Sequence, residues 1–475
     1  MLIVIHHLVV DVFSWRVILE DVQTALTQIR SGNDIDLGKK STSFKHWSEE
    51  IAIYSNSGEL VEDYAYWAGV SAGISAELPC DYHGKNAVAD VGVIENALGI
   101  DETNALLTET SACYGTEIND VLMTALAVTL SDWLETDNVL LDLEGHGRET
   151  FSESLDVSRT VGWFTSVFPM VLSVPDNRDF GACIRGIKEQ LRSVPMKGMS
   201  YGLLAYLTGN EDARATLANA PKAQISFNYL GQLDSVLSQD GLIAEAGECP
   251  GAEISAKGNR HYLIEINGRV QQGRLKMSWR YGRAIHREET VKGLADRFLA
   301  NLLTLISHCQ NQENSGYTPS DFPLAQLSQK QIDRLLPKGR CLEAAYPLSP
   351  VQEGMLFHSL YEPDSWVYFD QVSIGLGSNP NEEALFEAWR QVVARHQVLR
   401  TGFIWDDVAR PIQVIHQNIE LEIIHHDWRQ CTETEARLKL DDFLAADRTR
   451  GFDFSNPIGL AAGFDKNAEV IKPLL

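Results

Sequence analysis

Two adjacent histidines and an aspartate near the start of the chain form the motif with the clearest chemical potential. His6 and His7 follow the apolar residues 2–5, and Asp11 comes four residues after His7. Imidazole changes its charge near neutral pH, so a positioned histidine can accept or release a proton during a reaction. A pair that only satisfies its own backbone and Asp11 in a buried core is the alternative. The apolar run predicts a short buried strand, and apolar residues at helical spacing over 17–29 predict a helix after the motif.

A second polar group follows the apolar run 139–143, which predicts a central strand. Residues 144–149 read Glu-Gly-His-Gly-Arg-Glu, with a glycine on each side of His146. Such glycines are typical of a tight turn in which the backbone passes close to another part of the chain. A solvated turn with a surface glutamate and arginine explains the same residues.

A third polar pair, Asn228 and Tyr229, stands in the run Phe-Asn-Tyr-Leu-Gly-Gln at 227–232. An amide and a phenol here could reach the same cavity as the groups above. Tyr229 could instead be a core aromatic residue whose hydroxyl is satisfied internally.

The elements that must position these groups are visible as periodic patterns. Strands are predicted at 91–98 and 160–169, helices at 102–110 and 288–305, and a buried helix at 121–130 with Asn119 or Asp120 near its cap. Residues 261–267 and 274–281 alternate in polarity around Gly-Arg-Val-Gln-Gln-Gly, which predicts a hairpin with a loose turn.

Bulk composition limits the classes of function. A chain of 475 residues with 44% hydrophobic and 22% charged residues is long and apolar enough for two or three packed domains. Its net charge of -25 argues against a nucleic-acid partner and against an anionic membrane. Seven scattered cysteines without a Cys-x-x-Cys pair indicate reduced thiols in a cytoplasmic protein, without a zinc site. No signal peptide or membrane-spanning segment is expected.

Four motifs carry a resemblance to a known family. HHLVVD, EGHGRE, TVGWFTSVFP and FNYLGQ occur in that order, and together they resemble the epimerization and condensation domains of nonribosomal peptide synthetases. EGHGRE favours epimerization. The resemblance implies an α/β, two-lobed chloramphenicol-acetyltransferase-like fold, truncated here and followed by part of a second copy.

The same resemblance implies a function. The α-carbon of an aminoacyl or peptidyl thioester, held on the phosphopantetheine arm of a carrier protein, would change from L to D. His7 and Glu144 would be the catalytic pair on opposite walls, His6 and Asp11 would hold the loop, and Asn228 and Tyr229 would steady the oxyanion. No metal or tightly bound cofactor is implied, and the partners would be a peptidyl carrier protein and neighbouring synthetase modules.

Two alternatives remain open. One is condensation-type acyl transfer, in which peptide bond formation replaces epimerization. The other is a catalytically dead fragment that only docks a carrier protein, and Val12 favours it because the family carries glycine directly after the aspartate.

The motifs also imply an order of domains. The His-His motif lies at the end of the first lobe in the family, so residues 1–95 are expected to be the remainder of that lobe and 96–310 the second lobe. Residues 311–345 are predicted to be a linker and 346–455 the N-terminal part of a condensation domain. Residues 456–475 resemble the start of dihydroorotate dehydrogenase, although a condensation domain that simply continues would explain them too. In the second domain, His425-His426-Asp427 lacks the three-residue spacer and is interpreted as a polar strand end.

Overall fold

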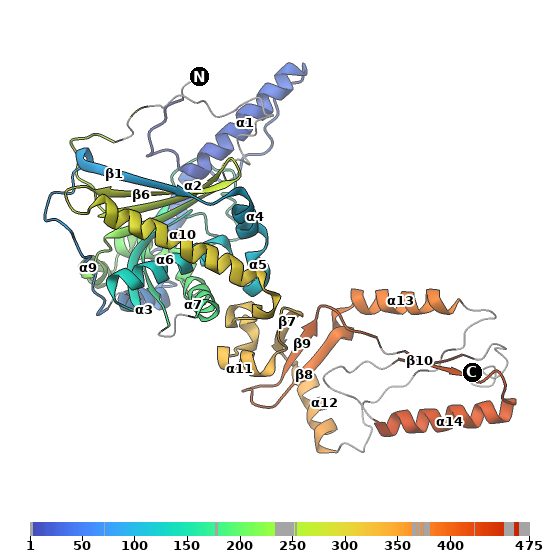
Figure 1. Ribbon diagram of the computed structural model, residues 1–475. Coiled ribbons are helices and arrows are strands. Elements are labelled where there is room, and N and C mark those ends of the chain that lie inside the picture. Colours follow the sequence, from blue (N-terminus) through green and yellow to red (C-terminus); the bar gives the residue numbers. More distant parts are fainter. Residues whose placement is uncertain are drawn as a thin grey trace. The chain divides into compact units, whose positions relative to one another are not determined.

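The structure is a computed structural model of the whole chain (Figure 1). It describes residues 3–464 except 71, 176–178, 233–250, 252–253, 363–367, 369–371, 373, 375–380, 422 and 451–459. The chain divides into two compact units, Met1–Asn314 and Ser315–Leu475.

A six-stranded mixed sheet forms the centre of the first unit. Its strands lie in the order β1-β6-β5-β4-β2-β3. The central pairs β2–β4 and β4–β5 are parallel, whereas the outer pairs are antiparallel. The strands are β1 (Val91–Ala97), β2 (Asn138–Gly145), β3 (Ser166–Ser173), β4 (Ile225–Gln232), β5 (Ile264–Gln271) and β6 (Arg274–Gly282).

Helices cover one face of this sheet and enclose the main hydrophobic core. The long helices α6 (Ile118–Leu134) and α10 (Glu288–Gln310) pack against each other, and α7 (Phe180–Arg192) packs against α6 (Figure 1). The helices α4 (Ile100–Thr108) and α5 (Thr110–Tyr114) adjoin α10. Since α6 is apolar around almost its whole circumference, it is the most deeply buried helix.

Alternation along the strands leaves the opposite face of the sheet polar. Leu141, Phe227, Ile266 and Trp279 point into the core, so their strand neighbours face the other way. Across that second face, residues in register form one row, which comprises Glu95, Ser278, Asn267, Asn228, Glu144 and Val167. We call this set the polar row.

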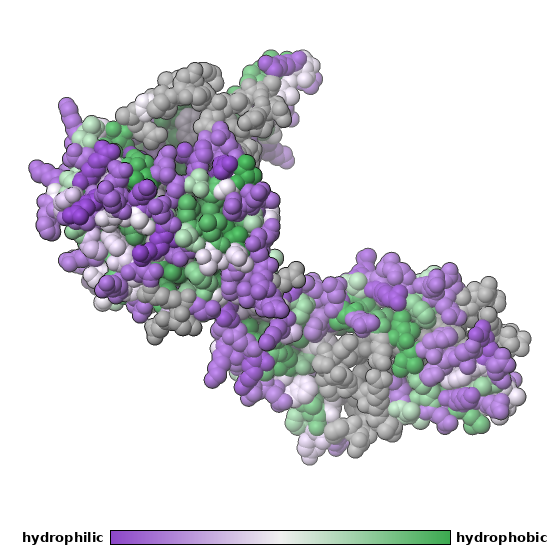
Figure 2. Space-filling model, in the orientation of Figure 1, coloured by the Kyte–Doolittle hydropathy of each residue, from purple (hydrophilic) through white to green (hydrophobic). Residues whose placement is uncertain are grey.

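Shorter helices surround the sheet near β3. They are α2 (Phe44–Tyr54), α3 (Val61–Val70), α8 (Met199–Gly202) and α9 (Glu211–Asn219). Trp67 of α3 is almost fully buried, and its indole nitrogen donates to the Ser200 hydroxyl of α8. Hydrophilic residues dominate the visible surface of the first unit (Figure 2).

Two local predictions need correction, and one about a helix cap is confirmed. The strand expected at residues 2–5 is wrong: residues 3–5 are irregular, and Val4 is 83% exposed, because no neighbouring strand pairs with them in the described structure. Residues 160–165 are also irregular, and β3 begins only at Ser166. The expectation that Asp120 is near the cap of α6 is confirmed: Glu117 is the N-cap, and its amide donates to the Asp120 carboxylate at 2.7 Å in a capping box.

The hairpin at 264–282 is confirmed, but its turn is tighter than expected. The strand β5 continues through Gly268 to Gln271, so only Gln272 and Gly273 form the turn. Both have positive φ, 55° and 67°, which is typical of a two-residue hairpin turn.

The other predicted elements of the first unit are confirmed with shifted ends. The helix after the histidines is α1 (Val12–Arg30), which ends at Ser31 and Gly32. Strand β1 and helices α4 and α10 match the expected strand and helices.

The second unit has its own small core. A three-stranded antiparallel sheet in the order β7-β9-β8 consists of β7 (Leu342–Pro347), β8 (Thr401–Ile404) and β9 (Ile412–His416). It shares a hydrophobic cluster with α11 (Gln329–Leu335). The remaining elements are α12 (Pro350–Tyr361), α13 (Glu382–Arg395), β10 (Ile423–Asp427), α14 (Glu433–Arg450) and β11 (Leu460–Phe464). The sequence His425-His426-Asp427 ends β10, as expected.

Candidate active site

The loop before α1 fixes the orientation and the tautomer of His7. Its Nδ1 lies 2.5 Å from the carbonyl oxygen of Val10, which can only accept a hydrogen bond. Nδ1 therefore carries the proton, and Nε2 is left as the basic nitrogen. The ring stacks on Trp163 at 5.4 Å between centroids, and the residue is exposed. His6 stabilises the same turn, because its Nδ1 accepts from the amide of Leu8.

Asp11 anchors this loop from within the protein. It is 2% exposed and caps α1 by accepting a hydrogen bond from the amide of Ser14 at 2.6 Å. The amide of Phe164 donates to its second oxygen at 3.2 Å. Val12 follows as the first helical residue with a 43% exposed side chain, so a backbone that only glycine adopts is not required there.

Arg148 is the residue that sequence reasoning missed. Its Nη2 donates to both carboxylate oxygens of Asp11 at 3.1 and 3.2 Å, and both side chains are almost fully buried. Its Nη1 donates to the carbonyls of Val157 and Thr160 at 2.8 Å. Burial lowers the pKa of the guanidinium, and Asp11 opposes this shift.

The ion pair ties the two predicted loops together. Asp11 stands four residues after His7, and Arg148 stands four residues after Glu144. Because Asp11 and Arg148 are in contact, the loop of His7 and the loop that follows Glu144 meet at one buried ion pair. No local sequence pattern signals this contact, because it joins positions 137 residues apart.

The predicted close approach at the glycine loop is confirmed at Gly147. It has φ +64°, and a Cβ there would lie 1.7 Å from the carbonyl oxygen of Phe164. The loop is therefore packed against residues 160–165, the same segment that contacts Asp11, Ser14 and His7.

Glu144 is at the end of β2 on the polar face of the sheet. The residue is exposed, but neighbouring protein removes part of the solvation of its carboxylate, and this loss of solvation raises the pKa of the carboxyl. Charge on His7 acts in the opposite direction, whereas Glu265 raises the pKa further. That the two candidate bases share one site stays a prediction, which the electrostatic effect of His7 on Glu144 supports.

Asn228 is the direct partner of Glu144. Strands β2 and β4 are parallel neighbours, and the Asn228 Nδ2 donates to Glu144 Oε2 at 2.6 Å. Sequence reasoning placed these two residues in one cavity, and the structure brings them together.

Tyr229 is not brought to this group. As the next residue in β4 it points to the opposite face, where it packs against the core above Gly268. Burial raises the pKa of its hydroxyl to about 12, and the oxygen has no hydrogen-bond partner within the described residues.

Two pockets flank the pair formed by Glu144 and Asn228. The first, which we call the aromatic pocket, has a volume of about 720 Å³ and is lined by Trp47, Phe164, Phe168, Tyr201 and Val167, among others. Val167 is in register with Glu144. The second, which we call the basic pocket, has a volume of about 330 Å³ and includes Asn267, which is in register with Asn228.

Metal clusters and membrane-spanning helices are not features of the described chain. Over the described ranges, no group of three or more His, Cys, Asp or Glu side chains is arranged to hold a metal ion. Likewise, no helix in the part of the chain that the structure describes is both long and apolar enough to cross a membrane.

Sequence comparison identifies relatives among peptide synthetases. The chain is 41% identical over 460 residues to one of the linear gramicidin synthase subunits of Brevibacillus parabrevis, and this covers 96% of the chain and 6% of that protein. It is 34% identical over 467 residues to bacitracin synthase 3 of Bacillus licheniformis, covering 97% and 7% respectively. The chain thus spans a small part of the length of the curated relatives it matches.

Structure comparison agrees with these matches. The epimerization domain from the third module of tyrocidine synthetase B is similar with a TM-score of 0.60 and 37% identity, over 64% of this chain and 68% of that one. The expected α/β, chloramphenicol-acetyltransferase-like fold is confirmed. The boundaries of lobes and linker stay predictions.

The condensation-domain family matches the chain twice, over residues 1–328 and over 342–469. The second match includes much of the segment 456–475, so the comparison of that segment with dihydroorotate dehydrogenase stays a hypothesis. With both matches together covering most of its length, the chain belongs to the condensation-domain family of nonribosomal peptide synthetases.

Proposed function

We propose that the first unit epimerizes the α-carbon of an aminoacyl or peptidyl thioester from L to D. The observation that carries the proposal is Glu144, whose carboxyl pKa is raised and whose position is fixed by Asn228, within electrostatic reach of His7. The similarity to an epimerization domain at 37% identity supports the same reaction.

The chemistry needs two groups that exchange protons with one carbon from opposite sides. One group removes the α-proton, and the electron pair of the Cα–H bond delocalises onto the thioester oxygen as an enolate. The other group then delivers a proton to the opposite face of that carbon. The unprotonated Nε2 of His7 and the carboxyl of Glu144 suit this exchange. The raised pKa of the carboxyl is closer to the ordinary pKa of an imidazole, so a proton passes more easily between the substrate and either group.

The supporting residues have distinct proposed roles. Asp11 and His6 hold the loop of His7, and Asn228 orients Glu144 through its amide. We give Tyr229 a packing role rather than contact with the oxyanion, because its side chain lies on the core side of the sheet.

The substrate and partners follow from the family. We propose that a peptidyl carrier protein presents the thioester on its phosphopantetheine arm and that neighbouring synthetase modules supply and consume it. The proposed proton transfers use only side chains of this chain, so no tightly bound cofactor is assigned.

The test is stereochemical. Carrier-bound L-aminoacyl thioester incubated with the chain should approach a D/L mixture, measured by chiral chromatography after thioester hydrolysis. Glu144→Gln and His7→Gln should each slow this by roughly 10² or more, the usual size of a general acid–base contribution. Glu149→Gln and His146→Gln, in the same glycine loop, are the matched controls and should retain the parent rate.

The alternatives give different results in the same assay. Peptide bond formation with an added aminoacyl acceptor, without inversion, would identify acyl transfer instead. Carrier binding without either reaction would identify a docking module, and in both cases the epimerase proposal would be abandoned.

A further inference from the structure

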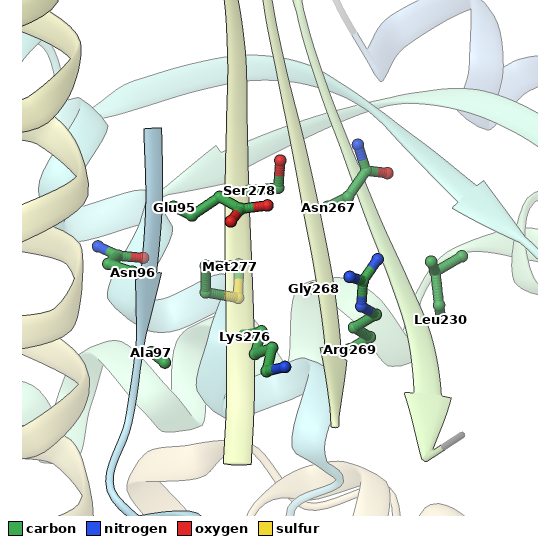
Figure 3. A pocket seen from close by; sticks show the side chains of 10 residues that line it. All are labelled: Glu95, Asn96, Ala97, Leu230, Asn267, Gly268, Arg269, Lys276, Met277 and Ser278. Carbon is green, nitrogen blue, oxygen red and sulfur yellow. The ribbon is translucent and has the colours of Figure 1, made fainter. Parts of the chain in front are cut away.

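The polar face of the sheet carries two cations next to the proposed site. Arg269 on β5 and Lys276 on β6 are directly opposite each other in the antiparallel pair. Both line the basic pocket together with Asn267 and Ser278, two members of the polar row (Figure 3). Like charges directly opposite on neighbouring strands destabilise a sheet.

The described protein does little to compensate this repulsion. Arg269 Nε and Lys276 Nζ both donate to one oxygen, Gln271 Oε1, at 3.3 and 3.1 Å. That oxygen belongs to a neutral amide. Within the described residues neither cation forms an ion pair, and Glu95, which lines the pocket from β1, is not within ion-pair distance of either one.

The pocket is close enough to the candidate bases to contact the same substrate. Asn267 is in register with Asn228, the partner of Glu144. Lys276 is on β6, two strands away from the β4 strand of Asn228, and its position along the sheet differs from that of Asn228 by two residues. With about 4.8 Å between strands and 3.3 Å per residue, roughly 12 Å separate the two Cα atoms. An extended peptide spans this distance with about four residues.

We propose that the basic pocket binds an anionic oxygen group of the thioester substrate. This inference rests on the proposed function and names the substrate class of the same site. The group could be a carboxylate on the acyl chain or the phosphate of the phosphopantetheine arm. The short separation from Asn228 favours a carboxylate on a residue close upstream of the reacting carbon.

A binding test needs no turnover and therefore stands apart from the proposed reaction. Thermal unfolding of the full chain is followed with N-acetyl-L-glutamate or inorganic phosphate at constant ionic strength. An anion that binds the folded pocket raises the melting temperature. The parent and Arg274→Gln, a control on the same hairpin outside the pocket, should show this rise, whereas Arg269→Gln and Lys276→Gln should lose it.

The same variants test whether Arg269 and Lys276 repel each other in the folded protein. Without added anion, Lys276→Gln should melt higher than the parent, because one of the two opposed charges is gone. A probe-induced rise that is equal in the parent and both pocket variants would overturn the proposal.

A kinetic test distinguishes the two sources of the anion. Peptidyl thioesters that differ only by glutamate or glutamine upstream of the reacting residue are compared, each with and without the pantetheine phosphate. If the acyl carboxylate binds, Lys276→Gln should raise KM about tenfold, equal to 1.4 kcal/mol, for the glutamate substrate only. If the phosphate binds, the rise should follow the phosphate instead.

Lys276→Arg should restore the parent KM in either case, because it keeps the charge. Unchanged KM values with every substrate would overturn the proposal. A parent chain that fails to epimerize any substrate, but still shows the thermal response, would refute the proposed function and leave the anion site standing.

Discussion

Replacing Asp11 by asparagine tests whether the buried ion pair holds the two candidate bases in place. The carboxylate accepts from Arg148 with both oxygens and also from the amides of Ser14 and Phe164. An asparagine has one accepting oxygen, so its amide would face at least one of these donors. The guanidinium, only 5% exposed, would lose its counter-charge.

The magnitude follows from this geometry. Removing one partner of a buried ion pair costs about 3–5 kcal/mol. Arg148 keeps two carbonyl acceptors and its stacking over Phe13 and Phe164, so we expect the lower end, about 3 kcal/mol of unfolding free energy. The epimerization rate should fall by about 10²-fold or more, because small displacements of a catalytic group cost that much.

Urea unfolding and D/L equilibration of the same protein sample measure both effects. Asp21→Asn is the matched control, since Asp21 lies in the same helix and pairs with Arg159 at the surface, where a lost ion pair costs at most about 1 kcal/mol. If Asp11→Asn behaves like Asp21→Asn in stability and rate, the ion pair does not organise the site.

Three further predictions address other parts of the structure. The surroundings of Glu144 raise the pKa of its carboxyl, so ionisation of this group opposes folding. Glu144→Gln should therefore be more stable than the parent at pH 7. In unfolding titrations this difference in stability should vanish as the pH falls below 4.5, where the carboxyl is protonated in both states. Gly147→Ala should lower the unfolding free energy by at least about 2 kcal/mol, because its Cβ would collide with the carbonyl of Phe164. The control Gly202→Ala, at a helical position with open space around it, should stabilise the protein slightly. Equal stabilities of the two variants would refute the close approach at Gly147. Fluorescence titration should show no FMN binding, because twenty residues at 456–475 cannot supply the barrel of a dihydroorotate dehydrogenase, and low-micromolar binding would contradict our interpretation of that segment.

Periodicity predicted most elements of the first unit because burial repeats along the chain itself. It failed where an element depends on contacts with segments that are distant in the sequence. Residues 2–5 are apolar enough for a strand, but the described residues 3–5 have no strand beside them. The turn at Gln272 and Gly273 was predicted too wide, since Gly268 resembles a turn residue yet sits in β5 beneath Tyr229.

The candidate site was predicted in part for a related reason. Motif resemblance supplied His7, Glu144 and Asn228, and strand register then explains why Glu144 and Asn228 meet. Successive side chains of a strand point to opposite faces of its sheet, so Asn228 and Tyr229 of β4 could not both face one cavity. The sequence alone therefore gave reason to question their assignment to one cavity. The contact of Arg148 with Asp11 joins positions 137 residues apart, and local pattern does not reveal it.

The most direct test of the central claim measures α-hydrogen exchange from each enantiomer separately. The L and D thioesters are each incubated with enzyme in deuterated water, and deuterium at the α-carbon is read by mass spectrometry before inversion is complete. If His7 and Glu144 act from opposite faces, His7→Gln should abolish exchange from one enantiomer and keep it from the other, and Glu144→Gln should show the reverse pattern. Exchange that falls equally from both enantiomers in both variants, or that is unchanged in either variant, would contradict the two-base account.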